Sequence, residues 1–125
     1  MAGGYEDLEV YQRALELAKS VYLVTKNFPK DEIYGMRDQI RRAVASVGAN
    51  VAESSGRFHF KDKLVFLYNA RGSLYETRHF VELGYQVGYI EEQIKSDLFR
   101  EIDLLAVKLN NFIGSLRAKN NKLTN

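Results

Sequence analysis

The stretch MRDQIRRAVASVGANVAESSGR, residues 36–57, decides how this chain folds. Its apolar residues recur at the spacing that lines one side of a helix, which predicts a face buried in a core. These residues are Met36, Ile40, Ala43, Val44, Val47 and Val51. Most of the remaining surface is small, and small side chains let a second backbone approach closely. We therefore predict packing on more than one side and an oligomer interface that includes Ala45, Gly48, Ala49 and Ala52.

Polar residues border the apolar face of this helix. Asn50 lies at the edge of the face, where we expect a buried polar residue that fixes helix register at some cost in stability. An exposed asparagine is the alternative. Gly48 costs about 1 kcal/mol relative to alanine inside a helix, and a close helix contact would explain it.

The composition is that of a single helical domain. The 125 residues are 46% hydrophobic and 27% charged, with one proline. The absence of cysteine excludes disulfides and thiolate metal sites. No apolar run approaches the ~18 residues of a membrane span, and the first residues lack the plan of a signal peptide. We therefore expect a cytoplasmic protein without a membrane partner.

The first helix, predicted at about 8–26 with Asp7 as N-cap, carries two apolar stripes. The first stripe repeats at the spacing of a helical bundle: Leu8, Tyr11, Leu15, Ala18 and Tyr22. The second lies ~100° around the helix and includes Val10, Ala14, Leu17, Val21 and Val24. Two stripes need two partners. We assign the second stripe to the oligomer interface; a helix buried centrally in a monomer is the alternative.

Three further helices complete the predicted fold. They span about 35–55, 61–86 and 91–117, and a polar tail follows at 118–125. Gly88 is the expected C′ residue of the third helix. Helices of this length joined by short loops predict an all-α, antiparallel up-down-up-down four-helix bundle, which we expect to oligomerise through its helix faces.

Two arginines fall inside the apolar stripe of the third predicted helix. Arg71 and Arg78 must find acceptors there, because an unpaired buried charge is costly. Glu82 follows Arg78 by four residues, and Glu53 is the candidate partner from the preceding helix. Alternatively, both guanidinium groups reach solvent or a groove and grip phosphate.

These elements together resemble the 23S rRNA intervening-sequence proteins. The matching segments are YEDLEVYQRALELAKSVY (5–22), FPKDEIYGMRDQIRRAVASV (28–47), ANVAES (49–54), FLYNARGSLYE (66–76) and GYIEE (88–92). The resemblance implies a cytoplasmic protein, a homopentameric ring of bundles and no established enzymatic activity. Accessory variability determinants of retroelements are a distantly similar group, thought to bind nucleic acid and a reverse transcriptase. One departure is the missing helix proline within Ser46–Ser54, whose loss should straighten that helix.

The leading functional prediction is a non-enzymatic, self-assembling scaffold that is also a candidate for binding RNA or another nucleic acid. A module that docks a nucleic-acid enzyme is the alternative. The phosphate contacts would be basic side chains. These are Arg37, Arg41, Arg42, Arg57, Lys61, Lys63, Arg117, Lys119 and Lys122.

A di-metal carboxylate enzyme is a further alternative. Glu76 and His79 fit the E-x-x-H spacing, but such bundles need two motifs, and His59 lies in a predicted loop without one. On a helical wheel Glu76 and His79 also point away from the apolar stripe. We therefore predict no enzymatic activity, no metal and no cofactor.

Overall fold

The computed structural model describes residues 4–124, and within this range the chain is all-helical, without strands. The α-helices are α1 (Glu9–Thr25), α2 (Met36–Ser55), α3 (Phe60–Gln86) and α4 (Glu92–Thr124). Two short 3-10 helices, η1 (Tyr5–Asp7) and η2 (Lys30–Glu32), precede α1 and α2. The predicted all-α class and its four helices are confirmed.

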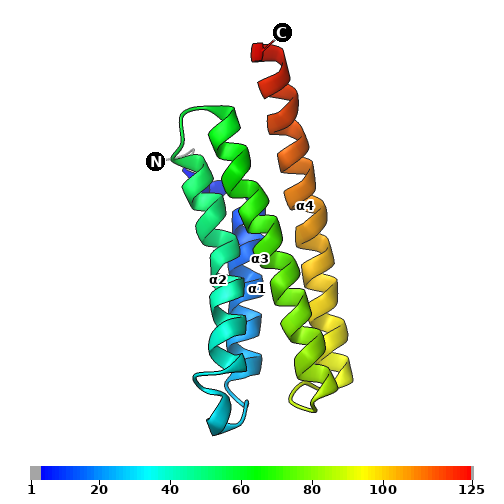
Figure 1. The fold of residues 1–125 in the computed structure, drawn as a ribbon. Helices are drawn as coiled ribbons and strands as arrows, with labels where there is room; N and C mark the ends of the chain where they lie inside the picture. The colour runs from blue at the N-terminus through cyan, green and yellow to red at the C-terminus, as the bar shows by residue number, and fades with distance from the viewer. Residues whose placement is uncertain (1–3, 125) are drawn as a thin grey trace.

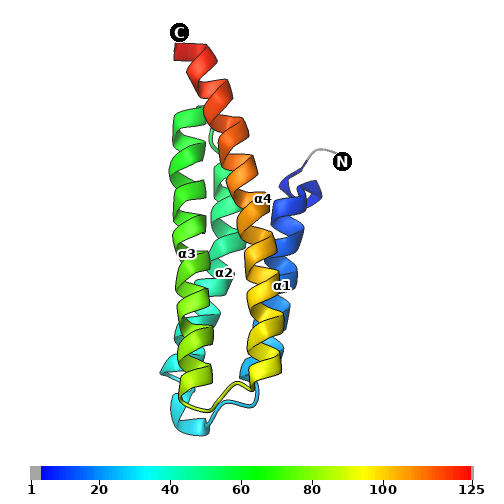
Figure 2. The ribbon, with the colours of Figure 1, turned by 90° about the vertical axis from the view of Figure 1, so that its right-hand side faces the viewer.

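The four helices lie side by side as long rods (Figures 1 and 2). The α1–α2 and α3–α4 connections lie at one end, and the α2–α3 connection lies at the other (Figure 1). At the end where α2 connects to α3, the last turns of α4 extend past the neighbouring helices. Within the described residues, none of the helices combines the length and the apolar character that a membrane span requires.

Two predicted helix ends need correction. Asp7 is not the N-cap of α1, because it lies in η1 and the N-cap is Leu8, which makes no side-chain cap. The predicted polar tail is helical as far as Thr124. Lysine is a good helix former and suits the negative end of the helix dipole, and Asn120 and Leu123 lie against the start of α3. Asn125 lies outside the described residues.

The predicted buried face of α2 is confirmed. Ile40, Val44, Val47 and Val51 pack in one core with apolar residues of the other three helices, and Met36 packs at the edge of that core. The fully buried residues of this face are Ile40, Val44, Val47 and Val51, with Ala43 nearly so. The helix is continuous through Ser46–Ser54, where the family pattern has a proline.

The assignment of the two stripes of α1 is wrong. Val10, Ala14, Leu17 and Val21 are buried in the core of the chain itself, and Val24 packs against that core, so the chain already covers the stripe predicted as an interface. The first stripe is only partly covered: Leu8, Tyr11 and Ala18 pack at the edge of the core, whereas Leu15 is 45% and Tyr22 42% exposed. Tyrosine tolerates this position because its hydroxyl stays hydrated while its ring covers apolar surface.

The α3–α4 turn is closed by a Schellman motif around Gly88, as predicted. Gly88 has φ +87°, the left-handed region that favours glycine. The Tyr89 N–H donates to the Gly84 carbonyl at 2.8 Å, and the Gly88 N–H donates to the Tyr85 carbonyl at 3.1 Å. These bonds satisfy carbonyls that the end of α3 would otherwise leave unpaired.

Tyr89 ties this turn to the α1–α2 connection. Its hydroxyl donates to Glu32 Oε2 at 2.9 Å, and its ring packs on Phe28 with centroids 5.4 Å apart. The other oxygen of Glu32 accepts the Met36 N–H at 3.2 Å and so caps the start of α2. The hydrogen bond to the Glu32 carboxylate raises the pKa of the Tyr89 phenol above its usual value.

We predict that Gly84→Ala destabilises the protein by about 1–3 kcal/mol through overpacking. A Cβ at residue 84 would lie 2.8 Å from Ile90 Cδ1 and 3.6 Å from Phe28 Cζ, and the Ile90 side chain is buried in the core. Gly72→Ala is the matched control in the same helix, because a Cβ there meets nothing within 4 Å. It should stabilise the fold by up to ~1 kcal/mol. Urea unfolding followed by circular dichroism measures both; equal effects would contradict the packing described.

Candidate interaction surfaces

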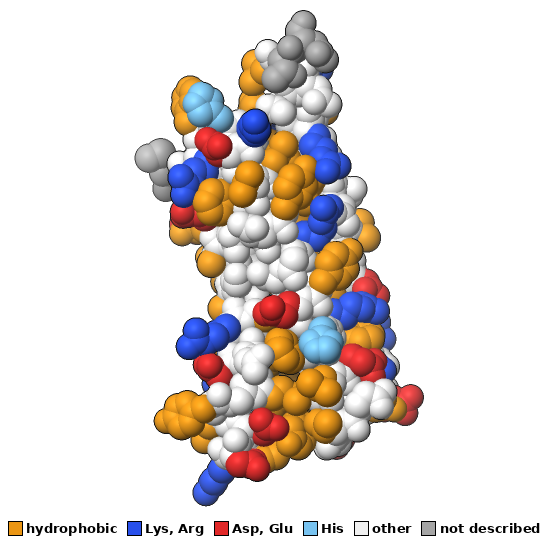
Figure 3. Space-filling model, in the orientation of Figure 1, with side chains coloured by type: hydrophobic (Ala, Val, Ile, Leu, Met, Phe, Trp, Pro, Cys, Tyr) orange, Lys and Arg blue, Asp and Glu red, His pale blue; other side chains and the backbone are white. Residues whose placement is uncertain are grey.

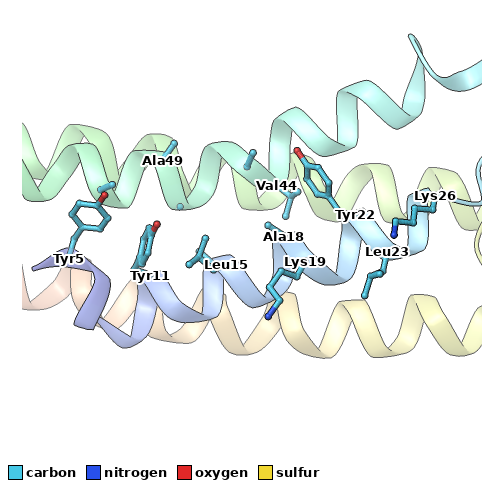
Figure 4. A pocket seen from close by; sticks show the side chains of 14 residues that line it. Tyr5, Tyr11, Leu15, Ala18, Lys19, Tyr22, Leu23, Lys26, Val44 and Ala49 are labelled. Carbon is cyan, nitrogen blue, oxygen red and sulfur yellow. The ribbon is translucent and has the colours of Figure 1, made fainter.

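An open apolar groove runs between α1 and α2 on the outside of the bundle. Its volume is about 760 Å³. Figure 4 shows the tyrosines at both ends of the groove and small side chains of α1 and α2 between them. The lining residues are Tyr5, Tyr11, Ala14, Leu15, Ala18, Lys19, Tyr22, Leu23, Lys26, Val44, Ala45, Gly48, Ala49 and Ala52. We call this surface the α1/α2 groove.

The small face of α2 forms one wall of the groove. Ala45 and Ala49 are exposed and Ala52 is half-buried, so these predicted interface residues remain accessible. Gly48 is buried beneath α1. A Cβ at residue 48 would lie 3.7 Å from both Ala14 Cβ and Tyr11 Cε1, which is ordinary van der Waals contact. The close α1–α2 approach within the chain therefore does not require glycine at this position.

A second uncharged surface lies on the outer side of α4. Leu104 is 41% and Val107 55% exposed, and Asn111, Gly114 and Ala118 continue the exposed line at alternating spacings of three and four residues. We call these five residues the α4 ridge. Sequence analysis missed the ridge because it lies beside the stronger stripe that α4 buries. The alternating three- and four-residue spacing of these uncharged residues was the signal in the sequence that could have revealed the ridge.

The polar residues predicted for the core make different contacts from those expected. Asn50 is half-buried and donates to the Ser46 carbonyl (2.8 Å) and Ser46 Oγ (2.9 Å), and Ser73 of α3 donates to Ser46 Oγ at 3.0 Å. Asn50 thus reaches α3 only through Ser46. Glu53 does not pair with either stripe arginine; it is exposed and pairs with Arg57 at 2.8 Å.

The two stripe arginines bridge α3 to α4. Arg71 donates to Asn110 Oδ1 at 3.0 Å, so its partner is an amide rather than a carboxylate. Arg78 pairs with Asp103 and lies 4.0 Å from the ring centroid of Phe99. Glu82, the partner expected for Arg78, instead contacts Lys95 at 2.7 Å. The Lys95 hydrogen bond lowers the pKa of the Glu82 carboxyl.

Three of the cations predicted to contact phosphate lie near the start of α2. Arg41 donates to Thr25 Oγ1 at 2.8 Å and the Tyr22 carbonyl at 3.1 Å, and its guanidinium lies 4.6 Å from the centroid of the Tyr22 ring. Arg42 pairs with Asp38 at 2.9 Å. Arg37 is half-buried. The contacts of Arg41 give it a structural role between α1 and α2.

The other predicted cations gather at the opposite end of the bundle. Lys63 donates to the Ser54 and Ser55 carbonyls at 3.3 and 3.4 Å, and Arg117 donates to the Tyr68 hydroxyl at 2.8 Å. Lys61, Lys119 and Lys122 are exposed there. On the face shown in Figure 3, basic side chains surround the upper parts of α3 and α4, and most acidic ones lie in the lower half.

The E-x-x-H pair faces away from the core. Glu76 and His79 are both exposed on the outside of α3, and His59 immediately precedes that helix. Residues 4–124 contain no cluster of three or more histidine, aspartate or glutamate side chains placed to hold a metal ion.

Comparisons with known proteins found one family and one solved structure to which the chain is similar. The model of the 23S rRNA-intervening sequence proteins matches residues 6–111. A crystal structure from Bacteroides thetaiotaomicron, of a protein with unknown function from the S23 ribosomal protein family, is similar with a TM-score of 0.77. It is 24% identical in sequence, and the match covers 83% of this chain and 97% of that one. The comparison with curated proteins found no match.

We predict that Arg41→Gln destabilises the fold by about 1–3 kcal/mol, because it removes hydrogen bonds of a charged group to Thr25 and Tyr22 and its contact with the tyrosine ring. Arg42→Gln is the matched control, since that side chain is exposed and makes only an i,i+4 pair, typically worth ~0.5 kcal/mol or less. Thermal and urea unfolding measure the difference. Equal stability of the two variants would contradict a structural role for Arg41.

Proposed function

The chain belongs to the 23S rRNA-intervening sequence protein family, and from this premise we propose that it is a non-enzymatic module that assembles with copies of itself. The α1/α2 groove carries this proposal. Large apolar side chains such as Leu15 and Leu23 are exposed there beside the alanines of α2. Contiguous apolar surface of this kind marks an interaction site more often than a solvated face.

The α4 ridge of a second copy is the occupant that fits the groove. The ridge carries no charge, and its leucine and valine would remove the apolar groove wall from water. Leu104 to Ala118 spans about 21 Å of helix, and Tyr11 to Lys26 along the groove spans about 22 Å. The exposed alanines of α2 would let the incoming helix approach closely.

This pairing joins two different surfaces and is therefore heterologous. Heterologous contacts close into rings when the rotation between neighbours allows it. A ring of five is the size implied by the resemblance to the family and to the accessory variability determinants, and it stays a prediction. The lining of the groove supports a non-enzymatic role, because it consists of apolar side chains, tyrosines and lysines. It offers no carboxylate, imidazole, thiol or aliphatic hydroxyl.

We predict that Ala49→Glu in the groove and Val107→Glu on the ridge each reduce the solution mass to that of one 14.3 kDa chain. Each variant buries a carboxylate at the proposed contact, which is costly without a partner. Val65→Glu is the matched control, because Val65 is exposed on α3, outside both surfaces. It should leave the mass of the wild-type assembly unchanged. Sedimentation velocity and light scattering at micromolar concentration measure all four proteins.

Mixing the two defective variants tests the heterologous geometry. Ala49→Glu retains an intact ridge and Val107→Glu an intact groove, so together they should form a one-to-one pair of twice the chain mass. A wild-type protein that sediments as a single chain would falsify self-assembly. It would favour the alternative, in which a nucleic-acid enzyme or another protein docks in the groove.

A further inference from the structure

Basic charge is concentrated in two segments that are far apart in the sequence. Residues 54–75 contain four basic side chains and one acidic one, and residues 104–124 contain four basic and none acidic. These segments therefore carry a formal charge of +7, whereas the whole chain carries +2. The remainder of the chain is net acidic by −5.

The fold brings the start of the first segment and the end of the second together at one end of the bundle. A cleft of about 600 Å³ lies between the start of α3 and the last turns of α4. Its lining residues are Phe58, His59, Phe60, Lys61, Asp62, Asn120 and Leu123. Figures 1 and 2 show this end, where the C-terminal turns of α4 rise beyond the α2–α3 connection. We call this end of the bundle, with the cleft and the exposed lysines Lys61, Lys119 and Lys122, the basic end.

An exposed aromatic side chain lies at the basic end. Phe58 is 89% exposed, and its ring contacts the His59 ring edge-on with centroids 5.0 Å apart. Exposure leaves the Phe58 ring accessible to a stacking partner. The last turns of α4 add Lys119 and Lys122, both exposed, and Lys61 lines the cleft itself.

We propose that the basic end binds single-stranded nucleic acid. Lys61, Lys119 and Lys122 contact backbone phosphates, and a base stacks on Phe58. Single-strand sites combine these two elements, a positively charged groove along the backbone and aromatic side chains beneath the bases. The partly engaged cations Arg57, Lys63 and Arg117 hold the local structure and add to the positive field.

The combination of charge and ring separates this occupant from other polyanions. An acidic peptide would satisfy the lysines but supplies no flat base for Phe58. A second copy of the chain would place Lys61, Lys119 and Lys122 against the same lysines if two basic ends met, which like-charge repulsion opposes. The residues involved lie outside the α1/α2 groove and the α4 ridge, although Lys119 directly follows Ala118 of the ridge. The proposal therefore stands independently of self-assembly.

The test uses fluorescence anisotropy of the full chain with a labelled 20-nucleotide single-stranded RNA of mixed sequence. Phe58→Ala should weaken binding roughly ten-fold, the loss typical of one stacked base. Tyr34→Ala is the matched control, because Tyr34 is 96% exposed but lies at the opposite end, next to Asp31 and Glu32. It should bind like the wild type.

The triple variant Lys61→Gln, Lys119→Gln, Lys122→Gln should reduce the slope of log affinity against log salt by about 2, as expected for three lost phosphate contacts on a single strand. Circular dichroism checks that the variants remain folded. Ala49→Glu, measured alongside, should still bind RNA even as a single chain, so failure of assembly and failure of binding are read separately. No anisotropy change for the wild type at 50 mM salt would overturn the proposal. So would equal affinities of Phe58→Ala and Tyr34→Ala, or displacement of the RNA by polyglutamate at matched charge concentration.

Discussion

The structure depends on which of the two apolar stripes of α1 the chain buries. The stripe that the chain buries fully consists of Val10, Ala14, Leu17 and Val21. Ala14 packs over Gly48 of α2 at ordinary van der Waals distance. Arg41 fixes the rotation of α1 further, because it holds Thr25 and the Tyr22 carbonyl from α2. Leu15 and Tyr22 of the other stripe are thereby left exposed.

That rotation creates the α1/α2 groove. The exposed stripe of α1 meets a face of α2 on which Ala45 and Ala49 replace the lysines and glutamates of an ordinary solvated helix. Burial of apolar surface is the main favourable term in association, which is why the proposed assembly uses the apolar surface that the core leaves exposed. The groove and the core are thus two consequences of one constraint on α1.

The sequence predicted the helices well because their ends are encoded locally. Pro29, Gly56 and Gly88 mark boundaries through backbone chemistry, and the predicted helices agree with the structure at those points within one or two residues. The end of α4 was missed because residues 118–124 contain no glycine or proline to stop the helix. The prediction of which α1 stripe the core buries was wrong because helical periodicity identifies apolar stripes but does not say how deeply each one is buried. Tyr11 and Tyr22 were the available signal that their stripe is the less buried one, because tyrosine tolerates partial exposure.

The contacts between helices were beyond prediction for a related reason. The spacing along one helix suggested Glu82 as the partner of Arg78, and Glu53 was the candidate carboxylate from the preceding helix. In the structure α4 instead presents Asp103 to Arg78 and Asn110 to Arg71. The basic end could not be predicted for the same reason. Its cations were visible in the sequence as two separate groups, and only the alignment of early α3 with late α4 combines them beside Phe58.

The charge asymmetry couples the two proposed roles. In a ring whose copies share one orientation, the basic ends lie on the same side and repel one another. A single strand that crosses several ends neutralises this repulsion and releases counterions as it does so. Because linkage is reciprocal, a polyanion that binds neighbouring copies more tightly than isolated ones strengthens their assembly by the same factor. In such a ring the apolar groove and the basic end, although built from different residues, would act on one equilibrium.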